Sequence, residues 1–363
     1  MKMTFYPNTK PVALLHFPDL LADSPWALNP NPLLAQVERE CQQWWSQYDV
    51  FPFGKKRELF KKQGFGMFAA IMHPRAGHVY LTNTAHYLYF LFAFDDIAEK
   101  VSAAEVIDMA KAVFAKLDPT AFPGPVPKVK GPIRELVRCM TSIWKDLLKT
   151  STPTFQRRFI ADFKDYIDAV IAEVSDKNQH HTPDLESYVS ARRKTGACRT
   201  TFDFIEYVDH LDVPDSIYAS PLMDELSDAG NDIITWSNDI YSFNREYWQG
   251  IHNYNMVSVM MNQNKVSVQE AINATAELYR ARVQNFVDIK EQFLESVAES
   301  FDDPRVLDHT AQYIQGLEDS LIGCIEFNFA SNRYFGEHSE VVRRELVIPF
   351  APGPARPLPG KAY

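Results

Sequence analysis

The sequence predicts an all-α fold in a single large domain. Of its 363 residues, 46% are hydrophobic and 13% aromatic, which is enough to bury a large core. Apolar residues recur at three- and four-residue spacing along most of the chain, and this is the period of an amphipathic helix. Alternating segments long enough for a strand are few. We therefore expect ten or more helices and little sheet.

Six long segments carry the helical period. They are residues 32–48, 102–117, 133–149, 154–176, 185–208 and 268–297. The Pro-rich loop at 118–132 could divide two domains, but the residues before it also look helical, so one domain is favoured. The expected organisation is a partly irregular N-terminal segment at 1–33, a helical domain at 34–345 and a Pro-rich C-terminal tail at 346–363.

Composition and charge exclude several classes of function. The formal net charge of −10 argues against nucleic-acid binding, because phosphate backbones are held by clustered Lys and Arg. The longest apolar run, residues 87–94, is too short to span a bilayer, and the N-terminus shows no signal peptide, so no membrane insertion is expected. The cysteines lack the spacing of a zinc site or a disulfide framework and fit a reduced, cytoplasmic interior; they are Cys41, Cys139, Cys198 and Cys324.

A first acidic cluster lies in the sequence FAFDDIAEK. Asp95 and Glu99 are four residues apart and share one helical face, and Asp96 lies on the adjoining flank. A solvated last turn of a helix would also explain these charges. However, aromatic residues surround the preceding helix on all sides, which predicts that its end opens into a cavity. Carboxylates clustered there need a cation to stay ionised, and Mg²⁺ or Mn²⁺ suits oxygen ligands.

A second polar cluster lies in the sequence NDIITWSNDIYSFNREYWQG. Asn238, Ser242 and Glu246 recur every four residues and fall on one helical face, where helix propensity does not explain Asn or Ser. Their oxygens can hold one divalent ion, and Arg245 on the same face can reach an anion bound to it. The alternative is a polar outer face with Asp239 and Arg245 as ordinary surface charges. Two oxygen-ligand faces together suggest a cleft that holds several cations around a diphosphate.

The two clusters resemble the class I terpene synthases. DDIAE, followed about 140 residues later by NDIYSFNRE, is similar to that family's aspartate-rich motif DDxx(D/E) and NSE motif (N/D)Dxx(S/T)xxxE. The resemblance extends over roughly residues 60–335, and the length is that of a microbial one-domain enzyme of the fungal or bacterial sesquiterpene synthase type. It implies the isoprenoid synthase helical bundle with a central active-site cavity. Glu99 stands where many relatives have Asp, which leaves open whether it binds metal.

Two further matches extend the resemblance. Arg192 in YVSARRKTGA, 46 residues before the NSE motif, is similar to the family's diphosphate-sensing arginine, with Thr195 and Gly196 at the linker and effector positions of a helix break. Arg193 or Lys194 could be the sensor instead, because the register of the break is not determined by sequence, and a solvated basic turn would also explain these cations.

Near the C-terminus, FNFASNRYF contains Arg333 and Tyr334, which resemble the Arg-Tyr pair that closes over the diphosphate in this family. A lone Arg-Tyr pair is common, so this part of the resemblance depends only on the position of the pair after the other motifs.

The resemblance implies a metal-dependent reaction. Mg²⁺, expected as three ions and replaceable by Mn²⁺, would be bound by Asp95, with Asp96 in support, and by the NSE residues Asn238, Ser242 and Glu246. Hydrogen bonds to the diphosphate would come from Arg192, Arg245, Arg333 and Tyr334. Asp96 could instead pair with Arg192 as the site closes.

The implied activity is ionisation of a prenyl diphosphate, most commonly farnesyl diphosphate, and cyclisation of the carbocation to a sesquiterpene hydrocarbon or alcohol. Aromatic rings stabilise such cations through their quadrupole. Phe92, one turn before Asp95, is the first candidate, and weaker ones, each more often plain core, are Phe65, Phe68 and Phe327.

Other functions remain open at this point. A chain-elongating prenyl diphosphate synthase would carry a second DDxxD motif in place of the NSE motif, and a diterpene synthase would use geranylgeranyl diphosphate. An inactive helical binding protein would have no reason to keep these polar groups in register. The family resemblance also allows a homodimer.

Overall fold

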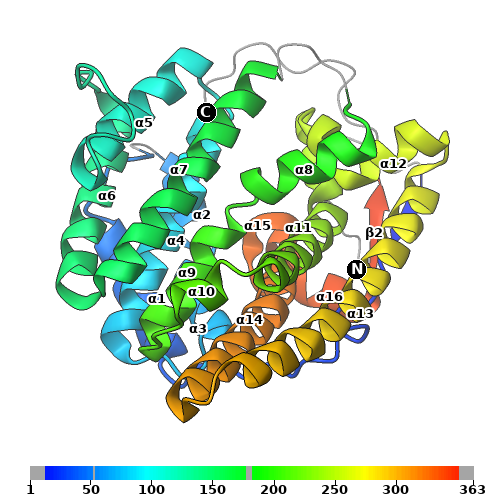
Figure 1. Cartoon of the computed structure of the whole chain (residues 1–363). Helices are drawn as coiled ribbons and strands as arrows, with labels where there is room; N and C mark the ends of the chain where they lie inside the picture. The colour runs from blue at the N-terminus through cyan, green and yellow to red at the C-terminus, as the bar shows by residue number, and fades with distance from the viewer. Residues whose placement is uncertain (1–12, 52–53, 177–181, 351–363) are drawn as a thin grey trace.

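The computed structural model describes residues 13–51, 54–176 and 182–350 as one bundle of helices (Figure 1). The first eight helices are α1 Leu34–Trp45, α2 Gly54–Lys61, α3 Phe65–Met72, α4 His78–Ala98, α5 Ala103–Leu117, α6 Gly131–Thr150, α7 Pro153–Asp176 and α8 Leu185–Thr195. The others are α9 Cys198–Asp209, α10 Asp215–Tyr218, α11 Pro221–Gln249, α12 Met256–Asn264, α13 Val268–Ser300, α14 Pro304–Ala330, α15 Asn332–Phe335 and α16 Ser339–Glu345. The all-α prediction is confirmed. None of the described helices has an apolar stretch long enough to cross a membrane.

Helix α4 is the buried centre of the N-terminal half. Its aromatic side chains pack on different sides: the Tyr89 ring stacks on Trp45 of α1 at 5.3 Å, and the Phe90 ring meets Phe163 of α7 at 5.9 Å. Because partners surround it, α4 has no continuous polar face for solvent. At its C-terminal end Asp96 is buried, Asp95 is half-buried and Glu99, just after the helix, is exposed.

The C-terminal half is built around α11, which α13 and α14 flank (Figure 1). Ile233, Ile240 and Phe243 of α11 are fully buried in this half. Helix α14 joins the two halves, because Phe327 packs in the α4 core and Phe329 packs in the α11 core. The facing ends of α4 and α11 are thus held at a fixed separation.

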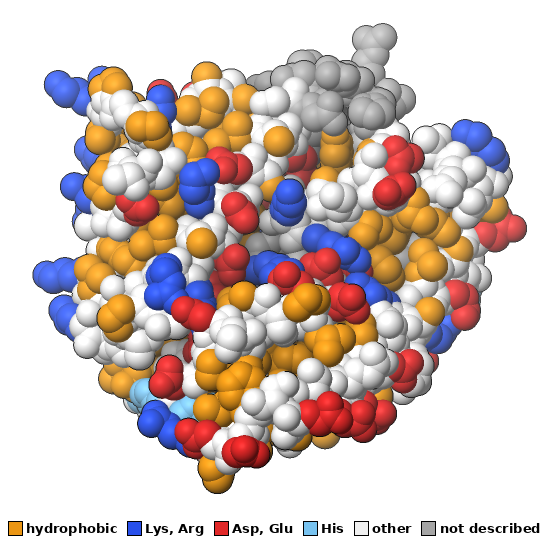
Figure 2. Space-filling model, viewed as in Figure 1, with side chains coloured by type: hydrophobic (Ala, Val, Ile, Leu, Met, Phe, Trp, Pro, Cys, Tyr) orange, Lys and Arg blue, Asp and Glu red, His pale blue; other side chains and the backbone are white. Residues whose placement is uncertain are grey.

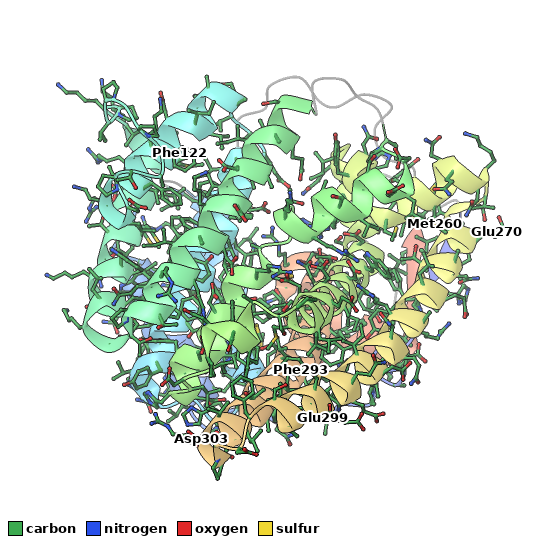
Figure 3. All side chains as sticks on the ribbon, viewed as in Figure 1. Phe122, Met260, Glu270, Phe293, Glu299 and Asp303 are labelled. Atoms are coloured by element: carbon green, nitrogen blue, oxygen red, sulfur yellow. The ribbon has the colours of Figure 1, made fainter. Side chains whose placement is uncertain are left out.

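The loop between α5 and α6 is no domain boundary. Phe122 from this loop (labelled in Figure 3) packs its ring 4.9 Å from Phe114 of α5, and Lys164 of α7 lies over the same ring. Leu117 before the loop and Leu136 after it belong to one core. A single domain is therefore confirmed.

Two short strands join the chain segments before and after the bundle. Strand β1 (Ala13–His16) pairs antiparallel with β2 (Val347–Phe350), and Gln269 of α13 hydrogen-bonds both the backbone N–H and the carbonyl of His16 at 2.8 Å. The sequence does not predict this sheet, because four residues are too few for a recognisable alternation. The expected tail at 346–363 thus begins with a strand, and its residues 351–363 lie outside the described part. The boundaries at 33 and 346 stay predictions.

This sheet supports the end of α11. The ring of Phe350 lies 5.1 Å from that of Tyr247, in the last turn of α11. Leu15 and Ile348 are buried in the same core as α11. The segment before the helical domain therefore contributes to packing beside the NSE residues.

Two carboxyl groups meet between α7 and α9. Burial raises the pKa of Asp162 to about 6, and burial together with the charge of Asp162 raises the pKa of Asp203 well above its ordinary value. The hydroxyl of Tyr218 donates to Asp203 at 2.8 Å. The folded state therefore holds protons here that the unfolded chain would release.

Asp162→Asn is expected to make the protein more stable than the wild type at pH 8. The stability that the protonated Asp162 contributes is present below the ordinary pKa of 3.8 and is lost as the pH rises through about 6. Urea unfolding between pH 4 and pH 8 checks this prediction, with the exposed Asp108→Asn on α5 as the control. Equal pH dependence in wild type and Asp162→Asn would contradict it.

Candidate active site

A cavity of about 220 Å³ lies between the α4 and α11 halves of the bundle. Figure 2 shows charged side chains of both signs gathered around a hollow near the middle of the face in view. Most of the predicted site residues line this cavity, namely Phe92, Asp95, Glu99, Arg192, Thr195, Gly196, Asn238, Arg245, Glu246, Arg333 and Tyr334. Residues up to 242 positions apart, Phe92 and Tyr334, thus meet at one place, as the sequence predicts.

The carboxylates at the end of α4 divide into two groups. Asp95 and Glu99 line the cavity, and the Asp95 side chain is 46% exposed. Asp96 is buried, and its Oδ1 accepts a hydrogen bond from Arg333 at 3.1 Å. Burial alone would raise the pKa of Asp96, but the positive charges of Arg333 and Arg245 outweigh burial and lower it. Asp96 is therefore an ionised partner of Arg333, and the alternative pairing with Arg192 is not seen.

Arg333 is held tightly beside the acidic cluster. Its side chain is 5% exposed, its guanidinium donates to Gln63 Oε1 at 3.0 Å, and it lies 5.0 Å from the centre of the Phe92 ring. Asp95 Oδ2 is 3.9 Å away. Helix α15, which carries Arg333, begins at a Ser331 cap and places this cation over the end of α4.

The NSE residues lie on one face of α11, as predicted. Asn238 and Glu246 line the cavity, and Ser242 between them is 1% exposed. Glu246 Oε2 accepts a hydrogen bond from Asn255 at 2.9 Å. Burial, and after it the negative charge of Asp239, raises the pKa of Glu246. The nearby polar side chain of Ser242 offsets part of this rise in pKa.

This donor set fits a hard cation. Ser242 Oγ is buried and has no hydrogen-bond partner in ordinary geometry among the described residues. A cation beside Glu246 would offset the neighbouring charge of Asp239 and satisfy Ser242 Oγ. Within the described residues, no group of three or more His, Cys, Asp or Glu could hold a metal by itself. An ion here would therefore need the amide and hydroxyl oxygens of Asn238 and Ser242 as well as Glu246.

Asp239 is a site residue that sequence reasoning missed. It is 1% exposed rather than a surface charge, and its carboxylate accepts hydrogen bonds from the Tyr188 hydroxyl, from Arg192 at 3.0 Å and from the backbone N–H of Met256 at 2.9 Å. Helical spacing could have found it, because Asp239 is three residues after the buried Trp236 and four before Phe243.

The structure separates the three consecutive cations at the end of α8. Arg192 lines the cavity and donates to Asn238 Oδ1 at 3.2 Å as well as to Asp239. Arg193 instead pairs with Asp228 and Asp232, and together with Lys194 it lines a separate open groove of about 1200 Å³. Arg192 alone of the three therefore faces the predicted metal ligands.

The predicted helix break between α8 and α9 is present. Helix α8 ends at Thr195, Gly196 follows it, and Ala197 has a left-handed backbone with φ of 56°. A Cβ atom on Gly196 would lie 2.6 Å from Thr235 Cγ2 of α11 and 3.0 Å from the Arg192 carbonyl. The close approach of the break to α11 thus depends on a residue with no side chain.

Gly196→Ala is expected to destabilise the fold by about 1–3 kcal/mol, the usual cost of overpacking. Thr235→Ser removes the methyl group that the new Cβ would contact, so the double variant should recover part of the loss. Urea unfolding of the two single variants and the double variant measures this. Equal stability of Gly196→Ala and wild type would contradict the packing argument.

The other end of the cavity is apolar. Phe68, Phe92 and Phe327 line it, and the rings of Phe68 and Phe327 stack 3.9 Å apart. Phe65 does not line it: its ring stacks on Phe92 at 4.7 Å, and Phe65 is a core residue, the alternative that the sequence left open. One end of the cavity thus offers charged and polar groups, and the other offers aromatic faces.

Arg245 lies at the polar end of the cavity. It forms no hydrogen bond or ion pair with another residue in the described part of the chain. Its guanidinium is therefore available to an anionic ligand.

Comparisons with known proteins agree with the two motifs at this site. The family described as "Terpene synthase family 2, C-terminal metal binding" matches residues 86–285, which include both motifs. Sesquiterpene synthase 3 of Postia placenta is 30% identical over 95% of this chain and 91% of that protein. Sesquiterpene synthase Agr1 of Cyclocybe aegerita is 29% identical over 95% of this chain and 94% of that protein. The crystal structure of germacradien-4-ol synthase from Streptomyces citricolor is 20% identical and aligns with a TM-score of 0.72 over 84% of this chain and 98% of that one.

Proposed function

The chain belongs to terpene synthase family 2, and from that premise we propose that it is a sesquiterpene synthase that ionises farnesyl diphosphate and cyclises the carbocation. The product would be a sesquiterpene hydrocarbon or alcohol, with diphosphate released. The names of its fungal relatives support farnesyl diphosphate over the longer geranylgeranyl diphosphate.

One observation carries the proposal. Two sets of oxygen ligands, from the end of α4 and from α11, face one cavity whose remaining wall is largely apolar and includes stacked aromatic rings. A diphosphate needs cations at one end of a site, and a prenyl chain needs an apolar surface at the other. This cavity has charged and polar groups for the diphosphate and an apolar surface for the prenyl chain.

We propose Mg²⁺ as the metal, as three ions and with Mn²⁺ as a substitute. Asp95 and Glu99 would hold it on the α4 side, and Asn238, Ser242 and Glu246 on the α11 side. When bound, Mg²⁺ supplies Lewis-acid stabilisation of the negative charge on the departing diphosphate. We assign Asp96 to holding Arg333 in place, because its carboxylate is already engaged by that guanidinium.

The diphosphate oxygens would accept hydrogen bonds from Arg192, Arg245, Arg333 and Tyr334. Arg245 is available, while Arg192 and Arg333 are held by buried carboxylates that keep each guanidinium at the cavity wall. Fixed donors of this kind stabilise the charge that develops as the C–O bond breaks. They also replace water around the leaving group, which protects the carbocation from hydration.

The aromatic end would stabilise the cation and guide the folding of the prenyl chain. Of the phenylalanines that line the cavity, Phe92 lies nearest to the polar end, because it is one turn before Asp95 and beside Arg333. Each well-placed ring contributes about 0.5 to 2 kcal/mol to binding a cation. Phe68 and Phe327 extend this surface toward the apolar end.

Product analysis tests the proposal. The purified protein is incubated with geranyl, farnesyl or geranylgeranyl diphosphate, with Mg²⁺ or with EDTA, and the extract is analysed by gas chromatography and mass spectrometry. The expected result is a cyclic C15 product from farnesyl diphosphate in Mg²⁺ only. Longer prenyl alcohols after addition of isopentenyl diphosphate and phosphatase treatment would instead identify a chain-elongating synthase, and a C20 product a diterpene synthase.

Two expectations stay predictions. A homodimer is tested by size-exclusion chromatography with light scattering. A cytoplasmic location is tested by fractionating the cells that produce the protein.

A further inference from the structure

The side-chain amide of Asn238 can serve as a metal ligand in only one of its two orientations. Its oxygen can bind a hard cation, whereas its NH₂ group can only donate hydrogen bonds. The two orientations have almost the same shape, so neighbouring groups must distinguish them. The contacts of Asn238 therefore decide whether α11 presents three oxygen ligands or two.

Asn328 of α14 has a determined orientation. It is 2% exposed, and its Nδ2 donates to the backbone carbonyls of Cys324 at 3.1 Å and Ile325 at 3.2 Å. Carbonyl oxygens only accept hydrogen bonds, so the NH₂ group of Asn328 must face them. Its Oδ1 consequently points the other way, toward α11.

Asn328 in turn determines the orientation of Asn238. Asn328 Oδ1 accepts a hydrogen bond from Asn238 Nδ2 at 3.2 Å, and Tyr334 Oη accepts from the same nitrogen at 2.8 Å. Asn238 Oδ1 then lies on the opposite side, where Arg192 donates to it at 3.2 Å. Every contact of the amide agrees with its oxygen facing Arg192 and its NH₂ group facing Asn328.

Of these contacts, we expect the hydrogen bond from Asn238 to Asn328 to persist during the reaction. A hydroxyl such as that of Tyr334 can donate as well as accept, so it permits either amide orientation. Arg192 only donates, but in the proposed function it donates to the diphosphate instead of to Asn238, while Asp239 still holds it. The orientation of the Asn328 acceptor does not depend on bound metal or diphosphate, because backbone carbonyls of α14 determine it.

We propose that Asn328 is a positioning residue that keeps Asn238 Oδ1 directed at the metal site. This inference rests on the proposed function and extends it to a residue outside both motifs. Residues that orient a metal ligand usually contribute 10- to 100-fold to metal affinity.

The test is Asn328→Leu, which keeps the approximate volume and removes the acceptor. Mn²⁺ affinity in the presence of inorganic diphosphate is measured by electron paramagnetic resonance, without any turnover. We expect Asn328→Leu to bind Mn²⁺ about 10- to 100-fold more weakly than the wild type. In an Asn238→Asp background both side-chain atoms are oxygens, so Asn328→Leu should then cause no further loss.

The control is Ser320→Ala, which removes a buried hydroxyl on the same helix that donates to the backbone carbonyl of Gly316 at 2.8 Å. It should leave Mn²⁺ affinity unchanged, and melting curves show whether each variant is folded. Wild-type affinity in Asn328→Leu, or an equal loss in both Asn238 and Asp backgrounds, would overturn the orienting role alone. Failure of the wild type to bind Mn²⁺ with diphosphate would overturn the proposed function and this inference with it.

Discussion

Asp95→Ala is expected to lower kcat with farnesyl diphosphate by about 10²- to 10³-fold, which is typical of losing one group that stabilises charge in the transition state. The Asp95 side chain lines the cavity and is 46% exposed, so it contributes little to the core. The melting temperature should therefore stay close to that of the wild type. Steady-state kinetics and thermal unfolding monitored by circular dichroism measure the two quantities.

Asp108→Ala is the matched control, because Asp108 is an exposed carboxylate on the neighbouring helix α5. It should leave both kcat and the melting temperature unchanged. If Asp95→Ala unfolds the protein, or keeps wild-type turnover, then Asp95 is a structural charge at the end of α4 and not a metal ligand.

Arg192→Lys is expected to lower kcat/KM by about 10²-fold or more, even though the positive charge is kept. A lysine cannot reproduce the planar fork with which Arg192 can reach Asp239 and an anion together. Keeping the charge also avoids leaving the buried carboxylate of Asp239 without a cation beside it, which would destabilise the fold. The loss should therefore appear in catalysis more than in stability.

Arg193→Lys supplies the comparison from the next position in the chain. Arg193 points away from the cavity to Asp228 and Asp232, and Asp232 keeps a second partner in Arg282 at 2.9 Å. Kinetics with farnesyl diphosphate should place Arg193→Lys near the wild type. A larger loss in Arg193→Lys than in Arg192→Lys would reverse the assignment of the diphosphate sensor.

Local spacing was sufficient to predict the parts of the site that lie within one helix. Asp95 and Glu99 share a face because they are four residues apart, and the same period aligns Asn238 with Glu246. The buried character of α4 follows from aromatic residues on all its sides, and this correctly placed Asp95 and Glu99 at the edge of a cavity. These features need no information about the rest of the fold.

The parts that could not be predicted depend on contacts between distant segments. Whether Arg192 or Arg193 faces the cavity depends on the residue at which α8 ends, and consecutive cations carry no periodic signal. Asn328 meets Asn238 only because α14 packs on α11, 90 positions away in the chain. Phe65 and Phe68 are both buried, and only the packing of α3 on α4 and α14 decides that Phe68 lines the cavity.

Binding of inorganic diphosphate tests most directly whether the α4 and α11 ligands act together on one anion. Isothermal titration calorimetry of the wild type, Asp95→Ala and Asn238→Ala is carried out with Mg²⁺ and again with EDTA. We predict that the wild type binds diphosphate in Mg²⁺ but not in EDTA, and that each variant weakens binding by at least about 10-fold. Equal binding in Mg²⁺ and EDTA, or wild-type affinity in either variant, would contradict a shared metal and diphosphate site.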